Sequence, residues 1–125
     1  MKLIQFARQE IAGESFSPAP ERIVAGAPAQ TVWNHYTDPT QRFYAGIWQG
    51  EPGAWRVVYA PHEEEFCVLL EGRVRITGDD GSEHLIEAGD AFVVPGGFTG
   101  VWENLTRVRK HYAIMQLKEN DHECA

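Results

Sequence analysis

Short apolar runs, each ended by glycine or proline, recur along most of the chain. Residues 73–77 alternate polar and apolar side chains with a period of two, which is typical of a strand buried on one face. Further runs rich in strand-forming residues lie at 54–60, 65–71, 83–87, 91–94, 100–103 and 108–117. No segment keeps a helical period for more than about three turns. The pattern predicts an all-β sandwich or barrel of short strands joined by tight turns.

The N-terminal part of the chain is patterned less regularly. Pro18, Pro20 and Pro28 interrupt residues 1–30, so we expect an extended arm with one or two short strands there. Residues 31–50 are rich in aromatic side chains, and Asp38-Pro39 predicts a turn between two strands. We therefore divide the chain into an arm (1–30), a barrel (31–117) and a C-terminal tail (118–125).

Length and composition agree with one globular domain. The 125 residues are 43% hydrophobic and 23% charged, which argues against disorder. The net charge of -7 argues against a nucleic-acid partner or an anionic membrane surface. Cys67 and Cys124 are too few for a disulfide framework, no apolar run reaches about 18 residues, and the first residues lack a signal-peptide pattern. These features predict a cytoplasmic protein.

The glycine and proline positions carry a more specific signal. Gly53, Tyr59, Pro61, Glu65 and Gly72 have the spacing of the first cupin motif, G-x5-H-x-H-x3-E-x6-G. The second motif, G-x5-P-x-G-x2-H-x3-N, is matched in spacing by Gly89, Pro95, Gly97, Gly100 and Asn104. With both motifs in register, the chain resembles the cupin superfamily. The stretches 65–74 and 108–112 resemble the small single-domain cupins grouped with (S)-ureidoglycine aminohydrolase, and ethanolamine-utilisation cupins lie nearby.

The resemblance implies a cupin double-stranded β-helix, or jelly-roll barrel, that is commonly a homodimer and holds a ligand inside the barrel. It covers about residues 31–117 and leaves the arm unexplained. A metal-binding cupin uses two His and one Glu of the first motif and the His of the second. Here these positions hold Tyr59, Pro61, Glu65 and Gly100, so three of the four donors are missing. We therefore predict no metal cofactor at this site.

Strand alternation indicates which side chains face the barrel. If Tyr59 and Glu65 point inward like their cupin counterparts, Trp55 shares the face of Tyr59 and Cys67 shares that of Glu65. Trp102 follows the inward position of Gly100. These five residues form a predicted aromatic pocket with a few polar groups, the usual composition of a small-molecule site. Cys67 is a candidate nucleophile, but no His has a partner spacing, so we interpret it as a buried apolar residue.

The last strand leaves two registers open. If Lys110 faces inward, it is a partner for Glu65 and Tyr112 shares its face, so both are included in the candidate ligand site. In the opposite register His111 faces the barrel and Lys110 lies on a basic rim beside Arg107 and Arg109. We favour the exposed rim. His62 lies in the turn before the strand predicted at 65–71. It is either a substitute metal donor or an exposed turn residue.

Three functions remain open. The first is a metal-independent protein that binds a small polar or carboxylated metabolite. The second is a metal-independent enzyme related to ureidoglycine aminohydrolase or isomerase chemistry, with Glu65, Lys110 and Tyr59 as the candidate catalytic residues. The third is a structural or regulatory subunit. The residues leave open whether the chain is an enzyme.

Overall fold

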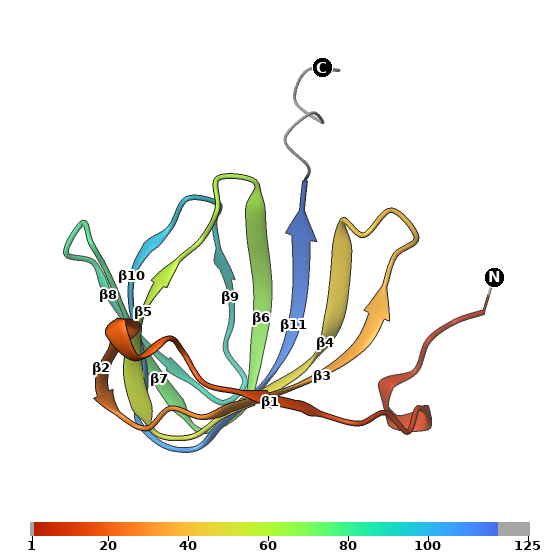
Figure 1. Cartoon of the computed structure of the whole chain (residues 1–125), viewed down its shortest axis with the longest axis horizontal. Coiled ribbons are helices and arrows are strands. Elements are labelled where there is room, and N and C mark those ends of the chain that lie inside the picture. Colours follow the sequence, from red (N-terminus) through yellow and green to blue (C-terminus); the bar gives the residue numbers. More distant parts are fainter. Residues whose placement is uncertain (1, 118–125) are drawn as a thin grey trace.

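Two antiparallel sheets face each other in the computed structural model, which describes residues 2–117 (Figure 1). The six-stranded sheet has the order β1 (Glu14–Phe16), β3 (Gln30–Thr37), β4 (Phe43–Gly50), β11 (Val108–Gln116), β6 (Glu63–Glu71) and β9 (Ala91–Val94). The five-stranded sheet has the order β2 (Ile23–Gly26), β5 (Gly53–Val58), β10 (Thr99–Asn104), β7 (Arg73–Gly78) and β8 (Glu83–Glu87). The predicted all-β jelly-roll fold is confirmed. The predicted tail, with Cys124, lies outside the described residues.

Most strand boundaries follow the sequence pattern. The runs 83–87 and 91–94 coincide with β8 and β9, and the turn at Asp38-Pro39 separates β3 from β4. Strand β6 starts two residues earlier than predicted, because Glu63 and Glu64 continue the backbone ladder opposite Gln116 and Met115. Backbone hydrogen bonds do not depend on side-chain polarity, so an apolar run marks the buried part of a strand rather than its full length.

The two strands of the arm attach to different sheets. Strand β1 pairs with β3 at the edge of the six-stranded sheet, and β2 pairs with β5 at the edge of the five-stranded sheet. Residues 17–22, which include the short 3-10 helix η2 (Pro20–Arg22), cross from one sheet to the other (Figure 1). A second 3-10 helix, η1 (Phe6–Arg8), precedes them. Neither helix of the described residues is long or apolar enough to cross a membrane.

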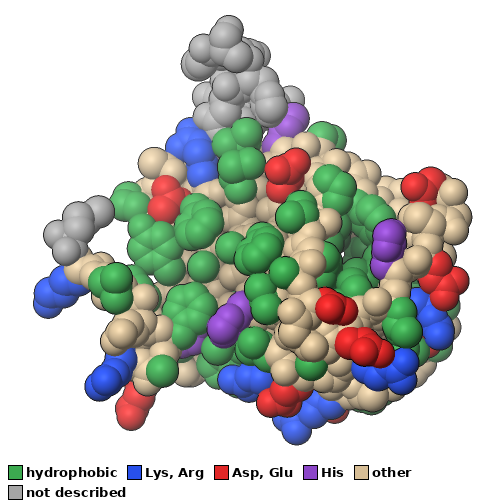
Figure 2. Space-filling model, turned by 180° about the vertical axis from the view of Figure 1, so that it is seen from behind, with side chains coloured by type: hydrophobic (Ala, Val, Ile, Leu, Met, Phe, Trp, Pro, Cys, Tyr) green, Lys and Arg blue, Asp and Glu red, His purple; other side chains and the backbone are tan. Residues whose placement is uncertain are grey.

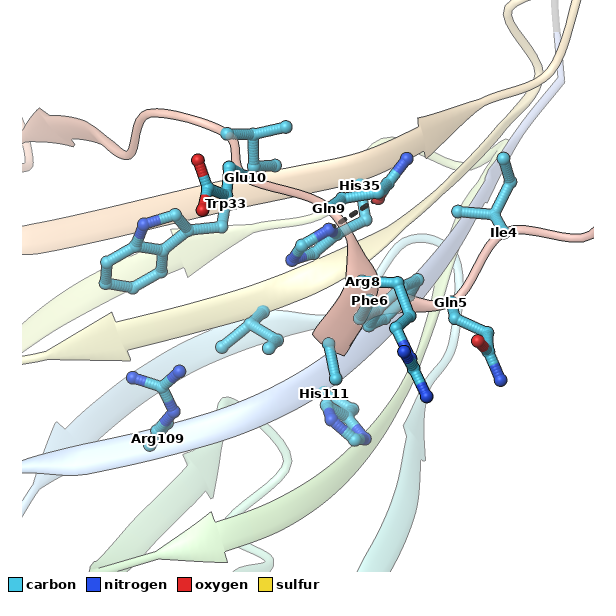
Figure 3. A pocket seen from close by; sticks show the side chains of 13 residues that line it. Ile4, Gln5, Phe6, Arg8, Gln9, Glu10, Trp33, His35, Arg109 and His111 are labelled. Atoms are coloured by element: carbon cyan, nitrogen blue, oxygen red, sulfur yellow. Dashed lines mark hydrogen bonds between the residues drawn. The ribbon is translucent and has the colours of Figure 1, made fainter.

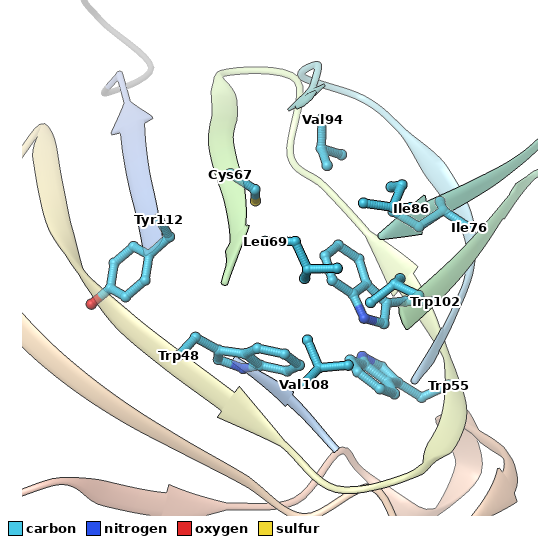
Figure 4. Packing of buried hydrophobic residues seen from close by; sticks show 11 residues of the cluster. Trp48, Trp55, Cys67, Leu69, Ile76, Ile86, Val94, Trp102, Val108 and Tyr112 are labelled. Carbon is cyan, nitrogen blue, oxygen red and sulfur yellow. The ribbon is translucent and has the colours of Figure 1, made fainter. Parts of the chain in front are cut away.

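The hydrophobic core lies between the sheets. Its buried members come from both sheets and surround a group of three tryptophans (Figure 4). In β7 and β10 every second residue is buried, which is the period expected for strands with one face in the core. The core comprises Trp48, Trp55, Cys67, Leu69, Val74, Ile76, Ile86, Val94, Trp102, Val108 and Tyr112.

The outer faces of the two sheets differ. On the five-stranded sheet, Arg75 forms ion pairs with Glu83 and Glu103, each at 3.1 Å. The six-stranded sheet exposes large apolar side chains on the three neighbouring strands β11, β6 and β9, and hydrophobic side chains gather on the side of the molecule opposite to that seen in Figure 1 (Figure 2). We call this set the outer apolar face; it comprises Phe66, Leu70, Val93 and Met115.

Candidate functional site

Three tryptophans occupy the centre of the barrel. Trp48 comes from β4, Trp55 from β5 and Trp102 from β10, and their ring centroids lie 5.9 to 6.2 Å apart (Figure 4). The indole N–H of Trp48 donates to Gln30 Oε1 at 2.8 Å, and that of Trp102 donates to Asn104 Oδ1 at 2.9 Å. These hydrogen bonds satisfy the polar edges of two buried rings and fix their orientation.

Lys110 points into the barrel, so the prediction of an exposed rim position is wrong. The side chains of Lys110 and Tyr112 lie on the inner face because these residues pair with Leu69 and Cys67, which are buried in β6. Lys110 is only 4% exposed, whereas its neighbour His111 is exposed. The pairing of β11 with β6 shifts its register between residues 109 and 110, a feature that a two-residue period does not reveal.

The ammonium of Lys110 has polar and aromatic partners. Its Nζ donates to Glu65 Oε2 at 3.0 Å and to Cys67 Sγ at 3.5 Å. The same nitrogen lies 4.3 Å from the ring centroid of Trp102 and 4.8 Å from that of Trp48. Cation–π attraction of this kind is stronger away from water. The indole rings and the carboxylate together compensate for the loss of hydration that burying an ammonium entails.

Glu65 connects this ammonium to Tyr59. The hydroxyl of Tyr59 donates to Glu65 Oε1 at 2.6 Å, while Oε2 accepts from Lys110. Each carboxylate oxygen therefore has one partner, and each keeps a lone pair for a further donor. Glu65 is 5% exposed, which is rare for a carboxylate unless it is paired.

The local electrostatics keep the phenol and the thiol protonated. Burial, and then the charge of Glu65, raises the pKa of Tyr59 well above its usual value. Burial likewise raises the pKa of Cys67 to about 12, so this thiol is neutral and a poor nucleophile at physiological pH. Burial alone would lower the pKa of Lys110, but its contacts with Cys67 and Glu65 outweigh it and raise the pKa. Because the thiol is neutral, the carboxylate is the partner that keeps Lys110 charged.

A cavity of about 170 Å³ lies beside this cluster. Of the predicted ligand-site residues, Trp55, Tyr59, Glu65, Trp102 and Lys110 line it. Cys67 is not among the lining residues, because it is fully buried next to the ammonium. The cavity is also lined by Gln30, Trp48 and Val57.

Two wider grooves lie next to the cavity, and both also include Glu65. They measure about 560 and 380 Å³, and both are lined by Phe16, Glu63 and Ile114. Tyr112, the seventh predicted residue, lines the smaller one and donates its hydroxyl to Asn34 Oδ1 at 2.7 Å. Together these recesses form the mouth of the barrel.

Sequence reasoning missed Gln30, and it counted Trp48 among the aromatic side chains of residues 31–50 without assigning it to the pocket. The predicted arm ended at residue 30, whereas Gln30 is the first residue of β3. Val32 packs against the core and Asn34 bonds Tyr112, so both have inner contacts. Extending that alternation back by one step places residue 30 inside the barrel, a signal that was present in the sequence.

The residues at the usual cupin metal position do not fit a divalent metal. Glu65 is the one carboxylate among the four positions, and the ammonium of Lys110 is bonded to it. A side chain at position 100 would bring its Cβ within 2.2 Å of the Thr77 backbone oxygen, so the strand has no room for a histidine there. Among residues 2–117, no three His, Cys, Asp or Glu side chains gather in an arrangement that could hold a metal ion.

A separate recess of about 920 Å³ lies outside the barrel, between residues 4–11 and the strands β3, β4 and β11 (Figure 3). The ring of Phe6 stacks on His35 with centroids 4.4 Å apart and meets the edge of His111 at 5.8 Å. His35 Nδ1 lies 2.7 Å from Gln9 Oε1. Burial lowers the pKa of His35, and His111 lowers it further, so the neutral ring is favoured. These contacts attach the arm to the sheet.

Comparison with known proteins supports this description of the fold. The EutQ-like cupin domain family matches residues 37–112, more than half of the chain. No curated protein sequence matches this chain. A protein of unknown function from Pseudomonas syringae pv. tomato, of the DUF861 family, superposes with a TM-score of 0.71 at 26% identity. The match covers 86% of this chain and 45% of that protein, so the chain spans less than half of its length.

Two further structures are similar in fold. A putative ethanolamine utilization protein from Salmonella typhimurium gives a TM-score of 0.60 at 20% identity, covering 74% of this chain and 72% of that one. A predicted oxalate decarboxylase from Thermotoga maritima gives a TM-score of 0.70 at 15% identity, covering 93% of this chain and 100% of that one. At these identities the likeness concerns the fold alone.

Proposed function

The chain belongs to the family of EutQ-like cupins, and from this premise we propose that it binds a small polar or carboxylated metabolite inside the barrel. The observation that carries the proposal is the cavity in which the Lys110–Glu65 pair and Tyr59 meet three tryptophan rings. A few fixed polar groups in an aromatic cavity orient a ligand while the rings bury its apolar surface.

We propose that binding is independent of a metal, because an ammonium takes the place beside Glu65 that a metal would need. The test is a metal assay on protein purified without added ions. We expect less than about 0.1 equivalent of any transition metal. Stoichiometric metal that is lost in Glu65→Gln would overturn this part of the proposal.

The binding role is tested with a metabolite panel in a thermal-shift screen, because a ligand that binds only the folded state raises its melting temperature. Each hit is confirmed by native mass spectrometry and then measured on Tyr59→Phe, which removes the hydroxyl and keeps the ring. We expect at least fivefold weaker binding. Tyr36→Phe is the matched control, since Tyr36 packs on Phe43 at 6.2 Å and lines none of the recesses described above. A panel without hits would contradict the proposal.

An enzymatic role is the second candidate, and the contacts of Glu65 favour it. A carboxylate hydrogen-bonded to both a phenol and an ammonium is able to take a proton from a ligand and pass it on. Related ureidoglycine or isomerase chemistry would then proceed without a metal. Once a ligand is known, turnover that falls at least a hundredfold in Glu65→Gln while binding persists would establish this role. If a ligand binds and is never converted, the enzymatic role is excluded and only the binding role remains.

We also propose that the protein forms a homodimer through the outer apolar face. A second copy carries the same charge of -7, so two copies repel each other except where the surface is uncharged. A twofold interface must be complementary to itself, and an apolar face meets that condition. Light scattering should give the mass of a dimer, and Phe66→Glu should give a monomer. Leu85→Glu is the control, because Leu85 is equally exposed on the five-stranded sheet (50% against 48%).

A further inference from the structure

We infer that Gln30 selects the ligand and that the ligand is a small neutral amide; this inference rests on the proposed binding role of the barrel. Gln30 is 6% exposed and lines both the cavity and the larger groove at its mouth. Its amide group therefore lies where the larger groove and the cavity meet.

The orientation of this amide is fixed by Trp48. An indole N–H only donates, so the Gln30 atom that it bonds at 2.8 Å must be the carbonyl oxygen. The amide nitrogen of Gln30 is then left with two N–H groups. Among residues 2–117 the structure gives these N–H groups no hydrogen-bond acceptor. No buried side-chain nitrogen or oxygen among these residues lacks a partner, so the amide nitrogen of Gln30 faces open space in the cavity, where an acceptor atom of a ligand can bond it.

An acceptor lines the same cavity. Glu65 uses one lone pair of each oxygen for Tyr59 and Lys110, and the remaining lone pairs accept further hydrogen bonds. The cavity thus offers a donor pair on Gln30 and an acceptor pair on Glu65. A molecule that matches both has a carbonyl oxygen and an N–H close together. The flat rings of Trp55 and Trp102 suit the planar group that carries these atoms.

The charge balance selects a neutral ligand over a carboxylate. Inside the cavity the ammonium of Lys110 is neutralised by Glu65, so no positive charge is left for an anion. At the mouth, the larger groove carries Glu21 and Glu63 beside Arg22 and Arg56, and Arg56 is bonded to Asp79, whereas the smaller groove carries Glu63 and no cation. A carboxylate that passes from the groove into the cavity leaves Arg22 behind and loses its hydration without gaining an unpaired cation there, which is unfavourable. The cavity of 170 Å³ equals about six waters in volume, so the buried part of the ligand has few heavy atoms.

The test uses acetamide and acetate, which have the same shape and differ in charge and hydrogen-bond donors. The three tryptophans supply the signal through their indole N–H resonances. We expect acetamide to shift the Trp48 and Trp102 resonances in a saturable way and to bind at least tenfold more tightly than acetate. Equal or tighter binding of acetate, or no shift with either probe, would overturn the inference.

A variant tests the contact of Gln30 with the ligand. Gln30→Met keeps the length of the side chain and removes both N–H groups together with the carbonyl oxygen that Trp48 bonds, and we expect it to weaken acetamide binding at least tenfold. Gln49→Met is the matched control, because Gln49 bonds Arg109 and lines none of the recesses described above. Unchanged binding in Gln30→Met would sink the inference. If this variant does not fold, the comparison of acetamide with acetate on the unmodified protein still tests the preference for a neutral amide.

The outcomes also distinguish this inference from the proposed function. Tighter binding of acetate that is lost in Lys110→Met would show a binding cavity with the opposite preference, so that only the role of Gln30 fails. A full metabolite panel without hits would remove the binding role itself.

Discussion

The two sheets of the barrel place their ion pairs on opposite sides. The five-stranded sheet carries them outside, where Arg75 reaches Glu83 and Glu103 and the side chains are 35% to 61% exposed. The six-stranded sheet carries its Lys110–Glu65 pair inside, with side chains 5% and 7% exposed, and its outer apolar face lies on the other side. The same chemical contact at nearly the same distance therefore stands in two different surroundings.

The difference shows what each pair contributes. Outside, water screens the attraction, and the pairs keep that face hydrated. Inside, both charges lose their hydration, so an apolar pair of the same volume would be at least as stable. The interior pair is thus poorly explained by stability, and it supports a role for these charges toward a ligand.

The largest expected effect comes from removing one partner of the interior pair. Lys110→Met leaves the carboxylate of Glu65 buried without its cation, which should lower the free energy of unfolding by about 3–5 kcal/mol. Urea denaturation with linear extrapolation measures it. The control is Lys110→Met combined with Glu65→Gln, which removes both charges and should recover most of the loss. A loss below about 1 kcal/mol in the single variant would mean that the pair behaves like a surface pair.

A smaller effect is expected from alkaline pH, and it also arises inside the barrel. The pKa of Cys67 rises from 9.0 to about 12 on folding, so the unfolded chain loses this proton first and stability falls as pH rises above about 9. Tyr112, with its pKa raised from 10.0 to about 12, and Lys110, with its pKa raised, act in the same direction at higher pH.

Between pH 9 and about pH 10.5, the thiol alone should lower the free energy of unfolding by about 2 kcal/mol. The measurement is the same urea titration repeated at each pH. Cys67→Ala should make this slope shallower, whatever its effect on stability at neutral pH. An unchanged slope in the variant would mean that the thiol does not carry the effect.

The smallest effect is expected on the five-stranded sheet. Arg75→Ala removes two ion pairs at once, yet its side chain is 41% exposed, so the loss should stay below about 1 kcal/mol. It should shrink further at high salt, because ions screen exposed charges. Urea titrations at low and high salt measure both. A loss as large as that in Lys110→Met would remove the distinction between the two sheets.

The sequence predicted the fold and part of the site for identifiable reasons. Turn residues at fixed spacing located the strands, and strand alternation placed Trp55, Glu65 and Trp102 on the inner face, because a period of two is inherent in strand geometry. The orientation of Lys110 was not predictable in this way. It depends on which residue of β6 lies opposite, and a register shift between strands far apart in sequence sets that choice.

The attachment of the arm was unpredictable for a similar reason. The pattern of residues 1–30 does not indicate that the two short strands of the arm extend different sheets. Their partners, β3 and β5, lie outside the arm and determine the pairing. The free amide of Gln30 depends on the same pairing, because it exists only where Trp48 has taken the carbonyl oxygen.

Two of the segments that link the sheets differ in length and in how they are held. At one seam, β8 and β9 are joined by residues 88–90, and Asp90 holds this turn with its backbone N–H and its carboxylate, both bonded to Glu87. At the other seam, residues 17–22 connect β1 to β2 over twice that length of chain. The mouth of the barrel therefore lies beside the longer link, whose Pro18 and Arg22 line the larger groove and whose neighbour Phe16 borders both grooves.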